Sequence, residues 1–218
     1  MVIRNIIKRI AYRWQYYKIK RVITVKGSHH NFGPTAHISL VDGSNKDDIV
    51  LDDYVDVFGL LMSQSHGKIT IGHHSRISRN VSVQCVDSIS IGNNVIISRE
   101  SVVCDSNNHP LSVLFRRVWS TCFNMPGSDM HLAKYASHKP IVIKDNVWIG
   151  ERSRICKGVT IGNNCVIGAN SVVTKDVPDN CIAAGNPAKV VKTDIDKLAD
   201  PTDCVTFNEF IRQYGSYF

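Results

Sequence analysis

Residues 141–177, IVIKDNVWIGERSRICKGVTIGNNCVIGANSVVTKDV, carry an aliphatic side chain at every sixth position. These positions are Ile143, Ile149, Ile155, Ile161, Ile167 and Val173. The residue four places after each of them is small or β-branched: Val147, Ser153, Val159, Cys165, Ser171 and Val177. A period of six fits neither the turn of an α-helix nor the two-residue alternation of a strand. It is typical of a coiled parallel β-solenoid, in which three short strands make each triangular turn.

The same pattern assigns an orientation to each position. The aliphatic residue points into the prism and the small residue fits near a corner, where Gly150, Gly162 and Gly168 can adopt tight backbone angles. Cys165 occupies a small position, so we expect it to be a core residue rather than a reactive thiol. The predicted fold class is an all-β solenoid of hexapeptide repeats, with an extended loop and short terminal helices.

Pairs of alternate aliphatic residues mark successive turns of this solenoid. The pairs begin at residues 49, 69, 89, 141 and 159, so the intervals between them are 20, 20, 52 and 18 residues. A regular turn of three six-residue strands takes 18 residues, and a bulge of two residues explains 20. The long interval must hold one turn plus an excursion, over about 104–140, which leaves after Val103. Loops of this length are more often lids or interface arms than connectors.

The ends of the pattern are less regular. Phe32 and Ile38 are expected to begin an irregular first turn, and Pro178, Gly185 and Pro187 to end the solenoid, because proline cannot donate a ladder hydrogen bond. We therefore predict three segments. They are a basic amphipathic helix over 1–24, the solenoid domain over 25–192, and a tail with a short capping helix over 193–218.

Composition limits the class of protein. No run of about 18 apolar residues is present, and basic residues interrupt any apolar core of a secretory signal at the N-terminus. The seven cysteines are widely spaced and form no CxxC motif, which argues against a disulfide framework or a zinc site. We therefore expect a cytoplasmic protein that requires no metal.

Basic charge is concentrated at the N-terminus. Residues 1–41 hold eight of the 26 Lys and Arg and no acidic residue, whereas the remaining 18 are balanced by 19 acidic residues. Apolar side chains lie between the basic ones at helical spacing: Ile3, Ile6, Ile7, Ile10, Trp14, Tyr17 and Ile19. Residues 1–23 are expected either to contact an anionic glycan or membrane, at its inner face, or to pack on the solenoid or a sister subunit. No nucleic-acid-binding motif accompanies the charge, so nucleic acid is not an expected partner.

A histidine lies where the excursion begins, in CDSNNHPL (residues 104–111). Histidine titrates near neutral pH and is the usual general base, so His109 is a candidate catalytic residue, although nine histidines compete. Asp105 could orient it or be an ordinary exposed carboxylate. On the preceding turn, Asn80 and Asp87 are candidates for acceptor contacts, with two ordinary corner residues as the alternative.

Trp148 occupies the position before the inward Ile149, so it should face outward. A large aromatic side chain held outward is expected to contact a sugar face, the arm of a cofactor, or a neighbouring subunit.

The repeat, the CDSNNHPL segment and the run DNVWIGERSRICKGVTIGNNCVIGANSVVTKDVPDNCIAAGNPAKVVK together resemble the hexapeptide-repeat acyltransferases. Within them the chain is similar to the sugar and capsular-polysaccharide O-acetyltransferases, over about 49–192. The resemblance implies a left-handed parallel β-helix and a homotrimer with active sites between neighbouring prisms. It also implies an enzyme that transfers acetyl from acetyl-CoA to a hydroxyl of a bacterial surface glycan or its precursor.

The same resemblance implies roles for individual residues. His109 matches the catalytic histidine, the general base for direct attack of the sugar oxygen, and Trp148 matches the tryptophan that lines the acceptor or thioester region. Positions that match contacts to coenzyme A are Ala169, Thr174, Lys175, Lys189 and Lys192. Glu151 departs from the family, which often has a small residue there, and this puts a side-chain contact to coenzyme A at that position in doubt.

The sequence is also compatible with other functions. The same fold and histidine would serve an N- or O-acetyltransferase for a nucleotide sugar or an antibiotic. A carbonic-anhydrase-like trimer would need three converging histidines, whereas His73 and His74 are adjacent and expected to diverge. A non-catalytic scaffold would bind no coenzyme A.

Overall fold

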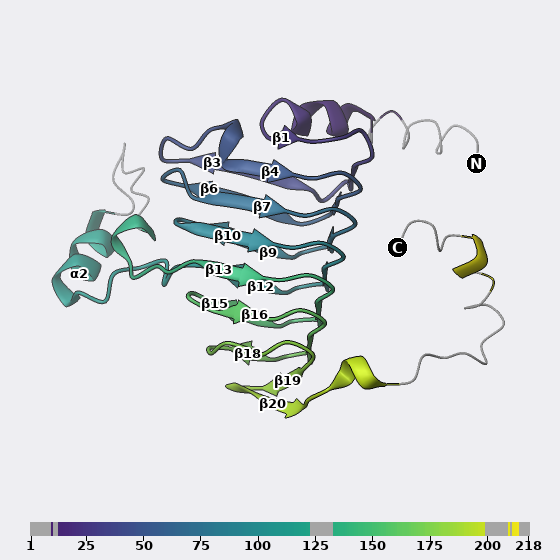
Figure 1. Cartoon of the computed structure of the whole chain (residues 1–218). Coiled ribbons are helices and arrows are strands. Elements are labelled where there is room, and N and C mark those ends of the chain that lie inside the picture. The colour runs from purple at the N-terminus through teal and green to yellow at the C-terminus, as the bar shows by residue number, and fades with distance from the viewer. Residues whose placement is uncertain (1–9, 11–12, 123–132, 199–208, 210, 214–218) are drawn as a thin grey trace, which may run out of the picture.

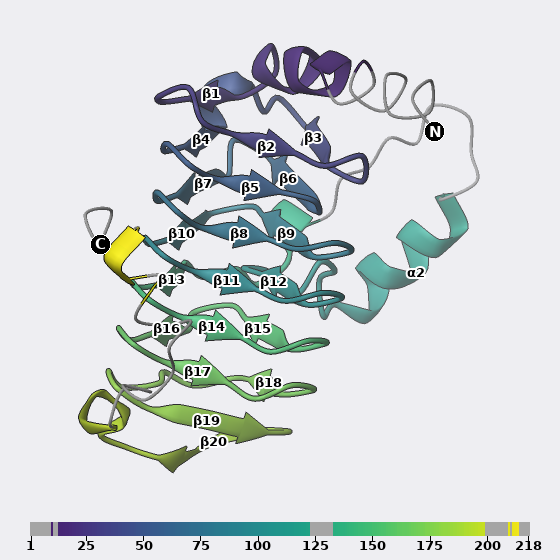
Figure 2. The same ribbon diagram turned by 90° about the vertical axis from the view of Figure 1, so that its right-hand side faces the viewer.

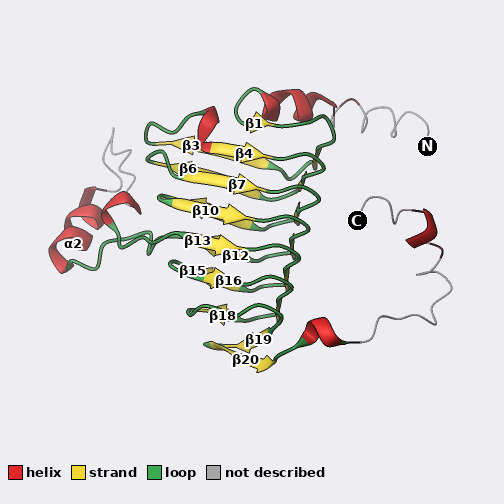
Figure 3. Cartoon of the chain, in the orientation of Figure 1, coloured by secondary structure: helices red, strands yellow, loops and turns green. Residues whose placement is uncertain are grey.

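The chain is built on three parallel sheets that form the sides of a triangular prism (Figures 1 and 2). The computed structural model describes residues 10, 13–122, 133–198, 209 and 211–213. Strands follow one another around the prism, and each pairs with the equivalent strand of the next turn. Figure 3 shows that short strands and tight corners make up nearly all of the prism, with helices only at its edges.

The three sheets differ in length. Sheet A contains β1 (Thr24–Val25), β4 (Ile49–Leu51), β7 (Lys68–Ile71), β10 (Ser88–Ile91), β13 (Ile141–Ile143) and β16 (Thr160–Ile161). Sheet B contains β2 (Asn31–Phe32), β5 (Asp56–Val57), β8 (Arg76–Ile77), β11 (Ile96–Ile97), β14 (Trp148–Ile149), β17 (Val166–Ile167), β19 (Ile182–Gly185) and β20 (Ala188–Lys192). Sheet C contains β3 (His37–Val41), β6 (Leu60–Gln64), β9 (Ser82–Cys85), β12 (Val102–Cys104), β15 (Arg154–Cys156) and β18 (Val172–Val173). The strands pair in parallel except β19 and β20, which are antiparallel.

The strand register confirms the predicted turns. Ile49 pairs with Ile69, Ile69 with Ile89, and Ile89 with Ile141, so residues 20 and 52 positions apart are neighbours in sheet A. The inward positions predicted from the six-residue period are buried, each at most 1% exposed: Ile143, Ile149, Ile155, Ile161, Ile167 and Val173. Cys165 is also a core residue, as predicted, at 1% exposure.

Left-handed backbone angles recur at the corners between sheets A and B and between sheets B and C. The corner between sheets A and B has positive φ at Tyr54, His74, Asn94, Asn146, Asn164 and Asn180. Asparagine tolerates this conformation better than most residues, and the amide side chains stack, Asn146 donating to Asn164 at 3.0 Å and Asn164 to Asn180 at 2.7 Å. The corner is therefore stabilised by local chemistry as well as by the core.

A neighbouring column of side chains caps the backbone of adjacent turns. The side-chain oxygens of Asn93, Asp145, Asn163 and Asp179 each accept a hydrogen bond from a backbone N–H one turn earlier, at 2.8–3.2 Å. Asp53 continues this column and accepts from the backbone N–H of His29 at 2.7 Å. Hydrogen bonds from His29 and from the backbone N–H of Tyr54 lower the pKa of the Asp53 carboxyl to about 2, because they favour its charged form.

The N-terminal helix covers the first turn of the prism and leaves most of the described residues of its predicted apolar stripe exposed. Residues 13–20 are helical, and Ile19 is buried while the ring of Tyr16 lies 5.8 Å from that of Phe32. Ile10, Trp14 and Tyr17, which share the predicted stripe with Ile19, are 64%, 65% and 54% exposed. Of the predicted stripe only Ile19 packs on the prism among the described residues, because Trp14 and Tyr17 lie on the opposite side of the helix from Tyr16 and Ile19. Contact of the exposed side with a sister subunit, a glycan or a membrane stays a prediction. Ile3, Ile6 and Ile7 lie outside the described residues.

The excursion leaves sheet C after β12 and returns into β13. Its base is closed by an antiparallel bridge between Ser106 and His138, and by the bond from Asn107 N to Ser137 O at 3.0 Å. Beyond the base it forms α2 (Val113–Cys122), which projects from the prism and buries none of its residues, and η2 (Ala133–Tyr135).

Short 3₁₀ helices complete the described chain: η1 (Lys46–Asp48) and η3 (Ile195–Lys197). Residues 209 and 211–213 are helical, but most of the predicted capping helix lies outside the described residues. None of the described helices is long and apolar enough to cross a bilayer.

Two adjacent isoleucines in β11 offer a direct test of the six-residue core. Ile97 is 0% exposed inside the prism, whereas Ile96 is 46% exposed outside it. We predict that Ile97→Ala lowers the free energy of unfolding by about 2–5 kcal/mol, because it removes buried methyl groups and leaves a cavity. Ile96→Ala should change it by no more than about 0.5 kcal/mol. Urea unfolding followed by circular dichroism measures both, and equal effects would contradict the assigned orientation.

Candidate functional site

His109 lies in a hollow at the base of the excursion. The side chain is exposed, and its ring centroid lies 4.8 Å from that of Trp119 on α2. The backbone N–H of His109 donates to Asn107 O at 2.7 Å, which forms a tight turn just before Pro110. None of the described residues forms a hydrogen bond with the ring nitrogens of His109, and the residue lines the hollow.

The hollow has a volume of about 520 Å³ and a basic lining. Arg116 from α2, Arg154 from β15 and Lys157 contribute positive charge around the imidazole of His109. Thr174, which follows β18, also lines it. Arg116 is fixed by its bond to Leu111 O at 2.8 Å. A group with this surrounding charge can accept a proton from a neutral nucleophile while cations stabilise the negative charge that develops on a reacting oxygen.

Trp148 faces outward from β14, as predicted, and is 55% exposed. Its indole N–H donates to Ser98 Oγ on the previous turn at 3.1 Å, which fixes the orientation of the ring. It lines a second hollow, of about 390 Å³, together with Asn94, Ile96 and η3 residue Ile195.

His109 and Trp148 do not meet within one chain. Trp148 belongs to sheet B, whereas His109 follows β12 of sheet C at the corner between sheets C and A, which lies across the prism from sheet B. The two side chains line different hollows. A site that uses both therefore needs two copies of the chain.

The residues predicted to contact coenzyme A are also spread over different sides of the prism. Thr174 and Lys175 follow β18 at the corner near His109, and only Thr174 lines that hollow. Ala169 lies at the corner after β17, where its backbone N would be 2.6 Å from a Cβ added to Gly150. Lys189 and Lys192 are exposed on β20 at the end of sheet B.

The two predicted acceptor residues lie at different corners and are not brought together. Asn80 is exposed between sheets B and C, with φ of 58°. Asp87 lies between sheets C and A, where its Oδ2 is 3.3 Å from Nδ1 of His138. The pair between Asp87 and His138 joins the returning end of the excursion to the prism.

Asp105 neither orients His109 nor faces solvent. It is fully buried, and its carboxylate accepts hydrogen bonds from the backbone N–H groups of Val86, at 2.9 Å, and Asp87, at 2.8 Å. Burial raises the pKa of Asp105, and these N–H donors oppose that rise. Asp105 therefore holds the corner before β10 in place beneath the excursion.

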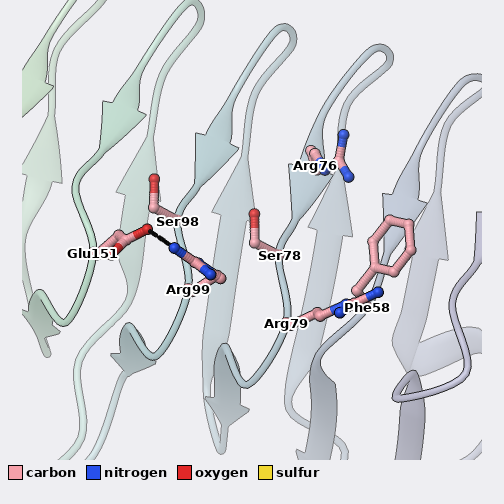
Figure 4. Close-up of a pocket in the computed structure, with 7 residues that line it drawn as sticks. All are labelled: Phe58, Arg76, Ser78, Arg79, Ser98, Arg99 and Glu151. Atoms are coloured by element: carbon pink, nitrogen blue, oxygen red, sulfur yellow. Dashed lines mark hydrogen bonds and ion pairs between the residues drawn. The ribbon is translucent and has the colours of Figure 1, made fainter.

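A third hollow, of about 380 Å³, was not predicted from the sequence. It is lined by Phe58, Arg76, Ser78, Arg79, Ser98, Arg99 and Glu151, and Figure 4 shows these residues on consecutive turns. The tripeptide Ile-Ser-Arg occurs at 77–79 and again at 97–99, one turn apart. This repeat is the sequence signal that could have located the cluster. Glu151, noted above as a departure from the family, pairs here with Arg99 at 2.8 Å.

The described histidines do not form a zinc site. No group of three or more His, Cys, Asp or Glu in the described part of the chain is placed to hold a metal ion. His73 and His74 do not diverge as expected, because they lie at a corner and their Nδ1 atoms approach to 2.9 Å.

Known proteins that are similar in sequence contain the same six-residue repeat or are acetyltransferases. Residues 140–175 match the family model described as bacterial transferase hexapeptide (six repeats). Galactoside O-acetyltransferase of Escherichia coli K12 is 36% identical over 124 residues, which cover 57% of this chain and 53% of that protein. Polysialic acid O-acetyltransferase of Escherichia coli O1:K1 is 34% identical over 141 residues, covering 63% of this chain and 40% of that protein. The chain thus spans about half the length of these curated relatives.

Solved structures show the same architecture. A hexapeptide-repeat acetyltransferase from Vibrio cholerae, in complex with acetyl coenzyme A, superposes with a TM-score of 0.56 at 25% identity, covering 87% of this chain and 84% of that one. The fold is the left-handed parallel β-helix that the family resemblance implied. In sequence and in fold, the chain resembles the hexapeptide-repeat acyltransferases, and among them the sugar and polysaccharide O-acetyltransferases.

Proposed function

We propose that the chain is an acetyl-CoA-dependent O-acetyltransferase that modifies a hydroxyl group of a bacterial surface glycan or its precursor. The observation that carries this proposal is the placement of His109. An imidazole that forms no hydrogen bond with any described residue lies in a basic hollow where the hexapeptide repeat is interrupted. The similarity to galactoside and polysialic acid O-acetyltransferases supports both the reaction and the class of acceptor.

His109 would act as the general base in a single displacement. A ring nitrogen takes the proton of the acceptor hydroxyl while its oxygen forms a bond to the thioester carbonyl carbon. The tetrahedral intermediate then expels the sulfur of coenzyme A, which receives the proton, and the acetyl ester remains on the sugar. Arg154 and Lys157 beside His109 can stabilise the negative charge on the carbonyl oxygen. No acyl-enzyme is required, because the donor and acceptor react directly.

The acyl donor would lie along the prism toward its C-terminal end. Thr174, which shares the hollow with His109, can contact the pantetheine arm, with Ala169 and Lys175 on neighbouring corners. Lys189 and Lys192 present ammonium groups on the exposed β20 and suit the phosphates of coenzyme A.

The Lys pair gives a separate test of donor binding. We predict that Lys189→Gln with Lys192→Gln raises the KM for acetyl-CoA about 5- to 50-fold with little change in kcat, because the phosphates are remote from the reacting atoms. Lys46→Gln, on the exposed face of η1, is the matched control. Steady-state kinetics with varied acetyl-CoA make the measurement, and an unchanged KM would remove both residues from the donor site.

A homotrimer would complete the site. His109 and Trp148 lie across the prism from each other, so the histidine of one copy and the tryptophan of the next can face one groove between two prisms. In this arrangement Trp148 contacts the acceptor sugar or the thioester, and Asn80 and Asp87 are secondary candidates for acceptor contacts.

The central prediction concerns His109. We expect His109→Ala to lower kcat for acetyl transfer about 10²- to 10⁴-fold, because the general base is lost. His37→Ala removes another exposed histidine and should leave the rate unchanged. The assay follows acetyl transfer from acetyl-CoA to a panel of surface polysaccharides, with matched hydroxyl and amine sugars to separate O- from N-acetylation. Full activity of His109→Ala would overturn the assignment.

Mixing two inactive variants tests the shared site. When His109→Ala and Trp148→Ala chains are unfolded together and refolded, about a quarter of the sites in randomly mixed trimers receive both intact residues, and activity should return to that extent. No return of activity would show that one chain supplies both residues or that trimers do not form. Light scattering of the same samples gives the oligomeric state.

The exposed side of the N-terminal helix suits an anionic membrane at the cytoplasmic face. Trp14 and Tyr17 are exposed, and Arg13 and Lys18 flank them, with Lys18 Nζ 5.4 Å from the Trp14 ring centroid. Aromatic and basic side chains together favour the interfacial region of anionic bilayers.

We predict that the full chain binds vesicles that contain phosphatidylglycerol and does not bind vesicles of phosphatidylcholine. Trp14→Ser with Tyr17→Ser should weaken binding about 10-fold or more, because both rings lose their buried area. Sedimentation with vesicles makes the measurement. Equal binding of the variant would show that this side of the helix does not contact lipid, and the matched change Val22→Ser is the control.

A further inference from the structure

The arginine-lined hollow on sheet B has a regular construction, which follows from the repeat. Ser78 and Ser98 occupy equivalent positions on neighbouring turns, and so do Arg79 and Arg99, as the pairing of β8 with β11 requires. Figure 4 shows these two pairs side by side across the hollow, with Phe58 at one end and Glu151 at the other. We refer to this hollow, lined by the seven residues named above, as the arginine groove.

The positive charge of the arginine groove exceeds the negative charge that faces it. Three arginines and one glutamate line it. Arg99 donates through Nε and Nη2 to the same oxygen of Glu151, at 3.1 and 2.8 Å, so its charge is compensated. Arg76 Nη1 lies 3.8 Å from Asp56 Oδ2, a loose pair. Arg79 forms no ion pair or side-chain hydrogen bond with any described residue.

The groove has room for a counter-charge beside Arg79. Arg79 and Arg99 occupy equivalent corner positions on neighbouring turns, directly after β8 and β11. Because Glu151 already pairs with Arg99, Arg79 is the guanidinium that an added oxyanion would compensate, and a guanidinium can donate two parallel hydrogen bonds to such a group.

Hydroxyl donors and a rigid wall complete the arginine groove. Ser98 Oγ accepts the hydrogen bond from Trp148, so its own O–H remains free to donate into the groove. Ser78 forms no side-chain hydrogen bond with the described residues. The guanidinium of Arg76 lies over the Phe58 ring, 5.0 Å from its centroid, and Phe58 is buried in the space left by Gly33. Arg76 is thus oriented before any ligand arrives.

The groove adjoins the residue assigned to the acceptor. Trp148 is on the turn after Ser98, and their hydrogen bond joins the tryptophan directly to the lining of the groove. We propose that the arginine groove binds an oxyanion carried by the acceptor, so that the acceptor is an acidic glycan with carboxylate groups on its sugars. This inference rests on the proposed acetyl transfer, and it names the class of acceptor that this reaction uses.

Two features favour the acceptor over the donor as the source of the oxyanion. The groove is lined by Arg76 on β8 and by residues that directly follow β5, β8, β11 and β14, whereas the candidates for the phosphates of coenzyme A lie at the C-terminal end of sheet B, on β20. Repetition of Ser and Arg on successive turns also offers similar contacts along the prism, which suits a polymer that carries a charge on each repeating sugar.

The test compares charge and sugar separately. The full chain is titrated by calorimetry with oligogalacturonate, oligomeric α-2,8-linked sialic acid and hyaluronan fragments, each beside its carboxyl-reduced neutral counterpart, and with galactose 6-phosphate as the phosphate source. We expect at least one acidic oligosaccharide to bind about 10- to 100-fold more tightly than its reduced form, as hydrogen bonds to charged groups require. Added salt should weaken this binding. Tighter binding of the sugar phosphate than of every carboxylate would overturn the carboxylate assignment.

Variants locate the binding. Arg79→Gln should abolish most of the preference for the acidic form, Arg79→Lys should retain part of it because the charge remains without the planar fork, and Lys46→Gln should retain all of it. Glu151→Gln should increase affinity for the acidic oligosaccharide, because it releases Arg99. A gain of this kind cannot result from misfolding.

The same samples separate the two proposals. Equal affinity for acidic and neutral oligosaccharides, or an unchanged preference in Arg79→Gln, overturns the acidic acceptor, even if acetyl transfer to a neutral glycan is present. A preference that depends on Arg79, with no acetyl transfer to any acceptor in the wild type, supports the anion site and overturns the proposed reaction. Acetyl transfer that favours acidic glycans and loses this preference in Arg79→Gln supports both.

Discussion

The prism depends on the burial of one aliphatic side chain from each strand. Three strands with two to five residues each cannot be stable alone, and each inward residue contacts equivalents on the turns before and after it. Ile77, Ile97, Ile149 and Ile167 form such a column in sheet B, all 0% exposed. Since the core is a set of columns, each outward position is free to vary with little effect on the fold. This freedom allows an arginine, a serine or a tryptophan to stand beside an inward isoleucine.

The excursion that interrupts the columns between β12 and β13 is held by hydrogen bonds rather than by the aliphatic core. β12 and β13 are connected through the excursion, yet Ile89 and Ile141 still pair in register, because the base of the excursion is tied on both strands. The buried carboxylate of Asp105 holds the backbone N–H groups of Val86 and Asp87 below this base, and Lys139 N donates to Asp105 O at 2.9 Å. The excursion can therefore position His109 while α2 projects outward without support from the core.

The regular features could be predicted from sequence and the irregular ones could not. The six-residue period predicted the inward isoleucines, the register and the outward Trp148, because each depends only on position within a repeat. The role of Asp105 could not be predicted, since its donors come from a turn 18 to 19 residues earlier. The exposed side of the N-terminal helix could not be predicted either, because Tyr16 and Trp14 are equally apolar in sequence and only the shape of the first turn selects Tyr16. The separation of His109 from Trp148 depends on which sheet each strand joins, and adjacency in sequence carries no such information.

The two ends of the prism affect whether two molecules can stack end to end. At one end the helix over residues 13–20 covers the first turn, and at the other β20 runs antiparallel to β19. A parallel solenoid with bare end turns could add a second molecule as further turns, and so extend into a fibre. Here an incoming first turn would meet a reversed strand bearing Lys189 and Lys192, which presents the wrong hydrogen-bonding pattern and an unfavourable charge next to the basic helix. The helix and the reversed strand thus disfavour end-to-end stacking of prisms in the part of the chain that the structure describes.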